Sequence, residues 1–442
     1  MINSYIFREY DIRGKVADDF PDHVVVKLGK AFGTFVRRAG RQEIGLSGDI
    51  RLTTPELMQS FKEGVLSTGT DIINLGIVPT PVNYFSMFHL GVAGAVQITG
   101  SHNPPEFNGF KLSLDKKAVY GKDIQTLYQT IEKMDFEEGE GTETRYRILP
   151  DYKKMFLEKI FLDKPMKVVM DCGNAAGAIN GPELFKELDL ELKELFCETD
   201  GTFPNHHPDP TVEENLQDLI REMKTGQYDV GLAFDGDADR VFLVDERARS
   251  VSGSTTTALV ARRVLQREPR ATVLYNLICS RAVPEVIAEN GGRAIRTRVG
   301  HSIIKQAMAE EGAAFAGEHS GHYYFRDNYR ADSGLIAALL VLEALSEFDG
   351  PMSDLLAPYE RYAASGERNT SVGDPAAVID RVAAHYADWP QDRLDGLTVD
   401  LGDWWFNVRP SNTEPLLRLN VEAADEATCQ IRVAEVQAVV GQ

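Results

Sequence analysis

Apolar and polar positions alternate along most of the chain in a way that indicates strands and helices in turn. Short apolar runs that end in polar or small residues indicate buried strands, and apolar residues recurring every three or four positions indicate amphipathic helices. Three successive passages share one order of strand, helix, strand, helix and strand, which is typical of α/β domains. The expected strands are residues 44–47, 72–75 and 95–98 in the first passage, 168–170, 190–196 and 230–234 in the second, and 273–275, 294–297 and 313–316 in the third.

The helix after the first strand of each passage is expected at residues 54–66, 181–188 and 283–290. Pro55 and Pro284 suit the first turn of a helix, where a backbone N–H has no partner to lose. The last passage differs, because two strands at 404–408 and 416–421 are followed by one amphipathic helix at 426–440. This order predicts a smaller α+β unit at the end of the chain.

The chain has 442 residues, which is more than one hydrophobic core usually serves, so several domains are expected. Polarity rises or the periodicity breaks near residues 149–152, 250–254 and 363–368. We therefore predict three similar mixed α/β domains and a smaller C-terminal α+β domain around a central cleft. The predicted boundaries are 1–150, 151–252, 253–364 and 365–442.

The third strand of each α/β passage runs into a polar loop that contains glycine. In open α/β sheets, ligands gather at the carboxyl ends of the strands. Ordinary turns are also rich in Gly, Asn, Asp and Pro, so one such loop alone would carry little weight. Three loops at matching positions favour three walls of one cleft. They are Thr-Gly-Ser-His-Asn-Pro at 99–104, Asp-Gly-Asp-Ala-Asp-Arg at 235–240 and Gly-Glu-His-Ser-Gly-His at 317–322.

The net charge and the longest apolar run exclude several classes of partner. A formal net charge of −20 repels nucleic acid and anionic membrane surfaces, so we expect neither as a partner. A phosphorylated small molecule can still bind where cations and backbone amides are concentrated locally. The longest apolar run, residues 335–342, is far too short for a membrane span, and residues 1–4 show no secretory signal.

Four cysteines, Cys172, Cys197, Cys279 and Cys429, lie far apart in the sequence and show no paired spacing. This spacing argues against a disulfide framework and against a zinc site. Unpaired cysteines fit a reducing compartment, so a cytoplasmic location is expected.

The second loop carries the most specific signal for a metal. Asp235, Asp237 and Asp239 alternate in sequence, so their carboxylates can converge on one ion, and such hard oxygen ligands suit Mg²⁺ or Ca²⁺. Arg240 adds a cation at the edge of this group. The alternatives are a Ca²⁺-stabilised turn and a solvated acidic turn. An EF-hand is rejected because residues 241–244 have the pattern of a strand where a helix would be required.

The first loop supplies a possible nucleophile in Ser101. A serine hydroxyl is weakly nucleophilic and needs a neighbouring base or metal, and His102 and Lys111 are the nearest groups that can assist. No Gly-x-Ser-x-Gly sequence surrounds Ser101, which disfavours a hydrolase of that type. Taken alone, Ser101 is more often a turn residue than a catalyst.

Two further segments offer groups for a phosphorylated sugar. Glu318, Ser320 and His322 can hydrogen-bond sugar hydroxyls, although such turns also bind metals or cap strands. The segment 409–415, Arg-Pro-Ser-Asn-Thr-Glu-Pro, combines a guanidinium with hydroxyl and amide donors and can cradle an anion. Its alternative reading is a plain hairpin turn. Arg13 and the polar turn 299–302 are assigned no function without the other loops.

Taken together and in order, these four loops resemble the α-D-phosphohexomutase superfamily, most of all its bacterial phosphomannomutase/phosphoglucomutase branch. The resemblance extends from Tyr10 to Glu414. It implies a phosphorylated Ser101 and a Mg²⁺ ion bound by that serine with Asp235, Asp237 and Asp239. It implies proton and charge transfer by Arg13, His102, Lys111 and Arg240, and substrate binding by Tyr10, His301, Glu318, Ser320, His322, Arg409, Ser411, Asn412 and Thr413.

The same resemblance implies an isomerase that interconverts the 1- and 6-phosphates of mannose or glucose. Phosphoserine gives its phosphoryl group to the substrate, a hexose 1,6-bisphosphate is the intermediate and activator, and the other phosphate returns to the serine. The fourth domain is expected to close as a lid about residues 363–368, and the chain to act as a monomer or homodimer. The alternatives are a metal-dependent phosphatase and a non-catalytic phosphosugar-binding protein.

The chain departs from this resemblance at Ile278, where relatives in this branch can carry a lysine. Isoleucine cannot replace a cation, so that part of the expected substrate contact needs another source. Arg281 and Arg298 are the candidates.

Overall fold

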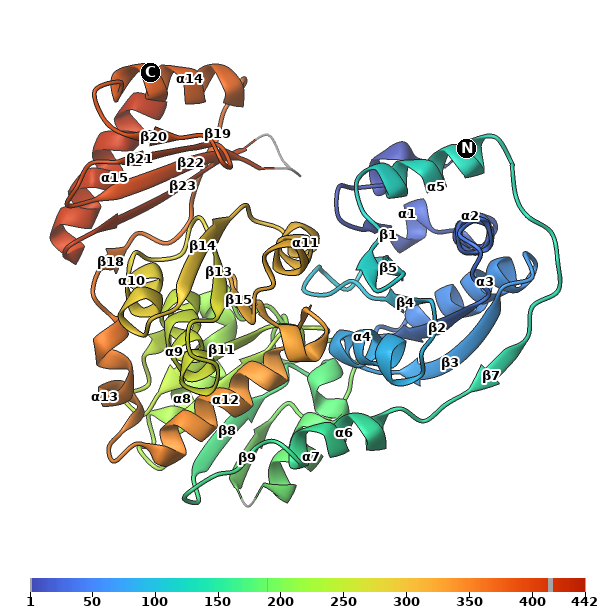
Figure 1. Ribbon diagram of the computed structural model, residues 1–442, viewed down its shortest axis with the longest axis horizontal. Helices are drawn as coiled ribbons and strands as arrows, with labels where there is room; N and C mark the ends of the chain where they lie inside the picture. The colour runs from blue at the N-terminus through green and yellow to red at the C-terminus, as the bar shows by residue number, and fades with distance from the viewer. Residues whose placement is uncertain (1, 189, 412–415, 442) are drawn as a thin grey trace.

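The computed structural model describes residues 2–188, 190–411 and 416–441 and divides them among four β-sheets that follow one another along the chain. Figure 1 shows the first domain, blue to teal, on the right and the fourth, red, at the upper left. The second and third domains, green and yellow to orange, lie together below them.

The first sheet has the order β1-β5-β4-β2-β3-β7, with β6 paired to β5. Its centre consists of three parallel strands, and β5 returns antiparallel beside β4. The strands are β1 (Ile12–Lys15), β2 (Glu43–Gly48), β3 (Asp71–Ile77), β4 (Gly94–Ile98), β5 (Phe107–Leu114), β6 (Lys117–Ala118) and β7 (Glu143–Arg145), and the helices are α1 (Val16–Asp19), α2 (Asp22–Arg38), α3 (Thr54–Leu66), α4 (Thr80–His89) and α5 (Lys122–Glu132).

The second sheet, β12-β11-β10-β8-β9, repeats this plan with three parallel strands and an antiparallel β11 beside β10. Because β10 is buried along its whole length, it reads as a continuous apolar run. The elements are α6 (Leu149–Leu157), β8 (Lys167–Asp171), α7 (Gly181–Glu187), β9 (Glu191–Leu195), α8 (Gln217–Met223), β10 (Val230–Phe234), β11 (Val241–Asp245) and β12 (Ser250–Val251).

The third sheet, β14-β13-β15-β16-β17, has the same parallel trio followed by antiparallel β16. Its first helix begins after Ser252, whose side chain accepts a hydrogen bond from the Thr255 N–H. The elements are α9 (Gly253–Arg267), β13 (Thr272–Asn276), α10 (Ala282–Glu289), β14 (Arg293–Thr297), α11 (His301–Glu311), β15 (Phe315–Gly317), β16 (Tyr323–Phe325), β17 (Ala331–Asp332), α12 (Gly334–Glu347) and α13 (Met352–Leu356).

The fourth sheet is antiparallel, with the order β18-β23-β22-β21-β20 and β19 paired to β23. Two helices pack on one face of it around a core of its own. The elements are β18 (Ala363–Ala364), β19 (Arg368–Ser371), α14 (Pro375–His385), β20 (Gln391–Asp392), β21 (Leu397–Asp400), β22 (Trp405–Pro410), β23 (Leu416–Ala423) and α15 (Glu426–Val440).

One hydrophobic core runs through both the second and the third domain. It joins β8 and β10 to α9 and α12, and it also includes residues of the first domain such as Val82 and Phe85 on α4. Helix α12 is buried almost all round, which explains its nearly unbroken apolar sequence. The rest of the first domain and the fourth domain have separate cores.

The predicted α/β fold class is confirmed, and all nine predicted α/β strands are present. The third strand of the third passage is shorter than predicted, because β15 begins at Phe315 rather than at residue 313. The short strands of the fourth sheet before residue 404 were not predicted, since two to four residues give no clear period. The domain boundaries stay predictions. Among the described residues, no helix is long and apolar enough to cross a membrane.

Candidate active site

The three polar loops lie at equivalent places, in the turns β4–β5, β10–β11 and β15–β16. In the first of them, Ser101 adopts a left-handed backbone conformation with φ of 48° and is only 4% exposed. Its Oγ lies 3.3 Å from Oδ2 of Asp235 and 3.1 Å from Nδ1 of His102. The hydroxyl therefore faces both the aspartate loop and a potential base.

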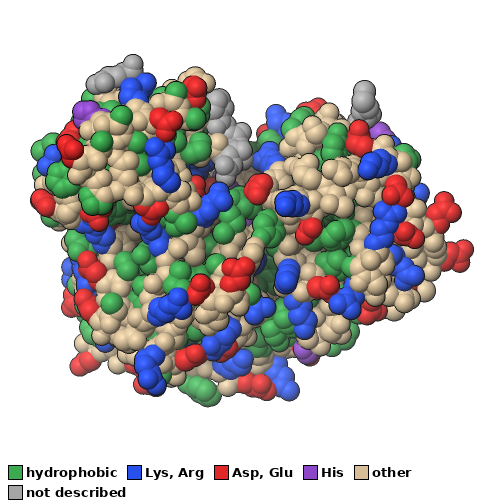
Figure 2. Space-filling model, turned by 45° about the horizontal axis from the view of Figure 1, so that its top comes forward, with side chains coloured by type: hydrophobic (Ala, Val, Ile, Leu, Met, Phe, Trp, Pro, Cys, Tyr) green, Lys and Arg blue, Asp and Glu red, His purple; other side chains and the backbone are tan. Residues whose placement is uncertain are grey.

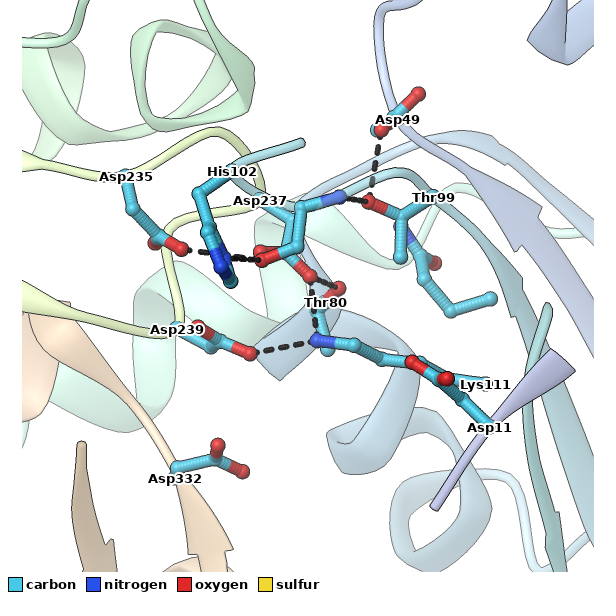
Figure 3. Close-up of polar contacts among 12 residues, drawn as sticks. Asp11, Asp49, Thr80, Thr99, His102, Lys111, Asp235, Asp237, Asp239 and Asp332 are labelled. Carbon is cyan, nitrogen blue, oxygen red and sulfur yellow. Dashed lines mark hydrogen bonds and ion pairs between the residues drawn. The ribbon is translucent and has the colours of Figure 1, made fainter. Parts of the chain in front are cut away.

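Arg51 stabilises the position of the serine loop. Its guanidinium, 2% exposed, donates hydrogen bonds to four backbone carbonyls, including that of Ser101 at 2.8 Å. A Cβ added to Gly100 would lie 2.4 Å from Cζ of Arg51, so only glycine fits there. Asp49 pairs with Arg51 at 3.3 Å. Asp49 also accepts a hydrogen bond from the Thr99 hydroxyl at 2.7 Å, which Figure 3 shows.

Sequence reasoning missed Arg51 and Asp49 as site residues. The available signal was their position directly after the first strand, where Gly48-Asp49 marks a polar strand end. Both side chains act on the position of the serine loop rather than on a ligand.

The three aspartates of the second loop converge, and all three are buried. This loop packs so closely on the first that a Cβ on Gly236 would lie 2.1 Å from the Ser101 carbonyl oxygen. Lys111 reaches from β5 and places Nζ 2.7 Å from Oδ2 of both Asp237 and Asp239 (Figure 3). Lys111, predicted as a cation that could face the Ser101 site, therefore lies against the aspartate loop.

The buried oxygens of this loop fit a hard divalent cation. Oδ1 of Asp237 and Oδ1 of Asp239 are buried without a hydrogen-bond partner, which is costly for a carboxylate unless a cation lies against it. Burial, with the neighbouring Asp239 carboxylate, raises the pKa of Asp235 to about 8. Burial would also raise the pKa of Asp237, but the Lys111 ammonium outweighs it and lowers that pKa.

His102 and two arginines surround the serine. Burial, and then the charges of Arg240 and Arg13, hold the pKa of His102 well below its ordinary value, so its ring is neutral at pH 7. Arg240 pairs with Asp235 through Nε at 3.0 Å. Arg13 donates to the side-chain oxygen of Asn103 at 2.5 Å and pairs with Asp11.

The third loop connects to the aspartates through His322. Its Nδ1 lies 2.9 Å from Oδ2 of Asp332 and 3.7 Å from Oδ1 of Asp239. Lys305, which sequence reasoning did not select, pairs with Oδ1 of Asp332 at 2.7 Å. Asp332 and Lys305 gave no signal in the sequence, because each lies in an element without an unusual motif.

Glu318 is buried and already has two partners. Its oxygens accept hydrogen bonds from the Tyr324 hydroxyl at 2.5 Å and from the Asn276 side-chain amide at 3.2 Å. These contacts fix the carboxylate and leave its remaining lone pairs for a ligand. Ser320 lies half-buried in the same turn.

Tyr10 and His301 bring the first and third domains together, with ring centroids 5.8 Å apart. The Tyr10 ring also packs on Gly300, whose φ of 129° and close approach exclude a side chain. Burial, with the nearby Lys305 charge, holds the pKa of His301 well below its ordinary value.

The fourth loop begins at Arg409, which is 7% exposed and pairs with Glu367 at 2.8 Å. Burial is the main cause of the lowered pKa of His319 in the third loop, and the charge of Arg409 adds to it. Ser411 accepts a hydrogen bond from Arg418 at 3.3 Å. The predicted substrate residues Asn412 and Thr413 lie outside the described residues. Figure 2 shows the surface hollowed between the fourth and first domains.

Arg281 and Arg298 are the two candidates to replace the lysine that relatives can carry at the position of Ile278. Their environments differ. Arg281 is bound to the fourth domain through Asp400 and the Gly402 carbonyl. Arg298 is exposed beside Tyr10 and lines an open cavity of about 670 Å³ together with Pro410. Arg298 is therefore better placed than Arg281 to supply a cation to the substrate.

The site is not uniformly positive, because buried anions around Ser101 match the cations. The locally positive surface expected from the sequence is thus a mixed one, and a phosphate would meet carboxylates as well as guanidinium groups. The cations are Arg13, Arg51, Lys111 and Arg240, and the carboxylates are Asp49, Asp235, Asp237 and Asp239.

Comparison with known proteins finds a family model that matches each of the four domains. The family models described as phosphoglucomutase/phosphomannomutase, alpha/beta/alpha domains I, II and III, match residues 4–138, 150–249 and 252–362. The model for the C-terminal domain of the same family matches residues 367–438.

Relatives cover nearly the whole chain. A phosphomannomutase/phosphoglucomutase from Pseudomonas aeruginosa is 38% identical over 95% of this chain and 92% of its own. A phosphoglucomutase from Neisseria meningitidis is 39% identical over 96% of this chain and 94% of its own. A crystal structure of a phosphoglucomutase/phosphomannomutase family protein from Burkholderia thailandensis matches with a TM-score of 0.94 at 36% identity, covering 100% of this chain and 98% of the other. The four domains, their order and these full-length matches show that the chain belongs to the phosphoglucomutase/phosphomannomutase family.

Proposed function

We propose that the chain is a phosphohexomutase that interconverts the 1- and 6-phosphates of mannose or glucose through a phosphoserine at Ser101. One observation carries the proposal: the Ser101 hydroxyl lies 3.3 Å from Asp235 in a buried aspartate triad, with the cations Lys111 and Arg240 against that triad. A turn serine without a catalytic role would not need three buried carboxylates beside it.

The reaction has two phosphoryl transfers. In the first, the bond between phosphorus and the serine oxygen breaks while a bond to the free sugar hydroxyl forms, and that hydroxyl loses its proton. The resulting hexose 1,6-bisphosphate turns round within the cleft. Its other phosphoryl group then passes to Ser101, which leaves the isomeric monophosphate. Transfers of this kind depend mainly on alignment and on neutralising charge.

Asp235, Asp237, Asp239 and the serine oxygen would hold Mg²⁺, as the free carboxylate oxygens at this place support. A bound ion would supply positive charge that offsets the negative charge of the transferring phosphoryl group. The protein's own cations are partly neutralised, because buried acidic side chains lie against them. Lys111 and Arg240 hold the carboxylates in position.

Two groups near Ser101 are placed to move the proton and align the substrate. A neutral His102 can accept a hydroxyl proton, since burial and the neighbouring arginines hold its pKa low. Arg13 is fixed by Asn103 and Asp11 beside the same loop and can contact the reacting phosphate.

The remaining residues would bind the sugar and its second phosphate. The Arg409 loop would hold the phosphate that does not react, with Arg298 supplying the cation that Ile278 lacks. Closure of the fourth domain over the bound sugar stays a prediction. The proposed substrate residues are Tyr10, His301, Glu318, Ser320, His322, Arg409, Ser411, Asn412 and Thr413.

The activity is tested with mannose 1-phosphate and glucose 1-phosphate, Mg²⁺ and a catalytic amount of glucose 1,6-bisphosphate. Hexose 6-phosphate is expected without release of free phosphate. Phosphate release in place of isomerisation would establish a phosphatase. Ligand binding with no turnover and no phosphate on Ser101 by mass spectrometry would establish a binding protein.

Removing the divalent cation with EDTA is expected to lower turnover about 10³-fold, because the ion supplies several kcal/mol of transition-state stabilisation. Asp239→Asn is expected to raise the Mg²⁺ concentration at half-maximal activity about tenfold or more, since a charged ligand is lost. Asp218→Asn on α8, a half-buried aspartate that pairs with the exposed Arg221 outside the aspartate triad, is the matched control and should behave as wild type. Full activity in EDTA would contradict the metal assignment.

Arg409→Ala is expected to raise the KM for hexose 1-phosphate about 10- to 100-fold, with a smaller change in kcat. The guanidinium would contact a phosphate that is bound equally in the ground and transition states. Arg368→Ala, an exposed position on β19 of the same sheet, should leave KM unchanged. Steady-state kinetics with both substrates measure the effect, and an unchanged KM in Arg409→Ala would remove this residue from the phosphate site.

A further inference from the structure

Two cysteines that are 25 positions apart in the sequence meet in the second domain. Cys172 follows β8 and Cys197 follows β9, and these strands are parallel neighbours in the sheet. Their sulfur atoms lie 3.3 Å apart, with the Cys197 thiol donating toward Cys172. The sequence spacing gave no sign of this pair, because the fold alone brings the two strand ends together.

The two sulfurs lie closer together than most unbonded sulfur atoms. A disulfide bond measures about 2.05 Å, so the sulfurs need to approach by only about 1.2 Å. Cys172 is buried, whereas Cys197 is half-buried and is the more exposed of the two. An oxidant would therefore reach Cys197 first and find Cys172 directly behind it. The other two cysteines, Cys279 and Cys429, are both buried in other domains.

We propose that Cys172 and Cys197 are an oxidative modification site at which a peroxide forms a reversible intramolecular disulfide. The Cys197 thiol is oxidised to a sulfenic acid as hydrogen peroxide is reduced to water. The Cys172 sulfur then attacks the Cys197 sulfur, and a second water leaves. In total, two thiols and one peroxide give one disulfide and two waters. A thiol reductant reverses the change.

The segment after Cys172 supports the aspartate loop. Because Asp171 is in register with Ala233, Cys172 lies beside the end of β10, which leads into Asp235. Ala176 donates a backbone hydrogen bond to the Gly236 carbonyl at 3.2 Å. The neighbouring Gly177 lies between the Cys172 sulfur and Ala238, since a Cβ there would be 3.6 Å from each.

The segment after Cys197 supports the serine loop in turn. His207 donates a hydrogen bond from Nε2 to the carbonyl oxygen of His102. His206, next to it, pairs with Asp171 at the end of β8 at 3.0 Å. Drawing the two sulfurs together therefore shifts the backbone that holds both reacting loops. We expect the disulfide to lower mutase turnover several-fold without unfolding the protein.

The test treats the purified full-length chain with hydrogen peroxide and maps the products by mass spectrometry of a non-reduced digest. A peptide that links residues 172 and 197 is expected, together with a fall in free thiols from four to two. Cys197→Ser should form no such link, while Cys429→Ala should form it as wild type does. Sulfinic acid at Cys197 without a linked peptide, or only links between two chains, would overturn the proposal.

The link is mapped independently of activity, so the result does not depend on the proposed function. Turnover is measured in the same samples before and after dithiothreitol. A several-fold loss that dithiothreitol restores, and that Cys197→Ser does not show, is expected. A complete disulfide with unchanged turnover would refute the coupling of this pair to the reacting loops.

Discussion

Ser101→Ala is expected to lower mutase turnover by about 10⁴-fold or more, because the proposed acceptor of the phosphoryl group is lost. The fold should persist, since alanine keeps the Cβ of serine at this φ of 48° and the change removes only the Oγ, which lies 3.1 Å from His102 and 3.3 Å from Asp235. Coupled kinetics measure the turnover, and intact-mass spectrometry measures phosphate on the protein after incubation with glucose 1,6-bisphosphate.

Ser113→Ala is the matched control, because Ser113 is a buried serine on β5 of the same domain outside the site. It should keep both the activity and the phosphate. Thermal unfolding of the two variants separates a catalytic loss from a folding defect. Near-normal turnover in Ser101→Ala, or phosphate retained in that variant, would show that another residue carries the phosphoryl group.

Arg51→Met is expected to lower the free energy of unfolding by about 4 kcal/mol and to remove most activity. The change removes a donor from four backbone carbonyls, of which that of Ser101 is buried, and the ion-pair partner from the buried Asp49 carboxylate. Arg51→Lys should recover only part of both losses, because an ammonium cannot reproduce the planar fork that reaches four carbonyls. Denaturant unfolding and kcat are the two measurements.

Arg38→Met provides the comparison for this effect. Arg38 is an arginine of the same domain whose ion pair with Asp135 is exposed, with side-chain exposures of 43% and 59%. An exposed pair contributes at most about 1 kcal/mol, so this variant should be nearly as stable as wild type and fully active. Equal losses in the Arg51 and Arg38 variants would mean that the serine loop does not depend on the buried guanidinium.

The sequence predicts most of the fold because each α/β passage repeats one clear pattern. Apolar runs such as 230–234 are bounded by polar loops, so the strands, their order and the position of the loops at their carboxyl ends follow directly. The candidate site follows from the same positions. Ser101 and the three aspartates, predicted from separate loops, lie in contact in the structure.

The parts that could not be predicted depend on tertiary contacts between ordinary residues. Arg51 has no motif and acquires its role only when the chain between 99 and 107 folds over it. Lys305 and Asp332 meet from different elements, and Cys172 and Cys197 meet only because β8 and β9 are neighbours. The spacing of these residues along the chain therefore does not predict that they are in contact.

The continuous core of the second and third domains has a mechanical consequence. It joins the strand that carries the aspartate loop to the sheet that carries Glu318, and none of its described residues belongs to the fourth domain. Because packed interiors resist deformation, we expect these two walls to keep a nearly constant separation. On the proposed function, the room that a bisphosphate needs to rotate is then expected to come from displacement of the fourth domain, which would release the distal phosphate while the aspartate loop and Glu318 keep their spacing.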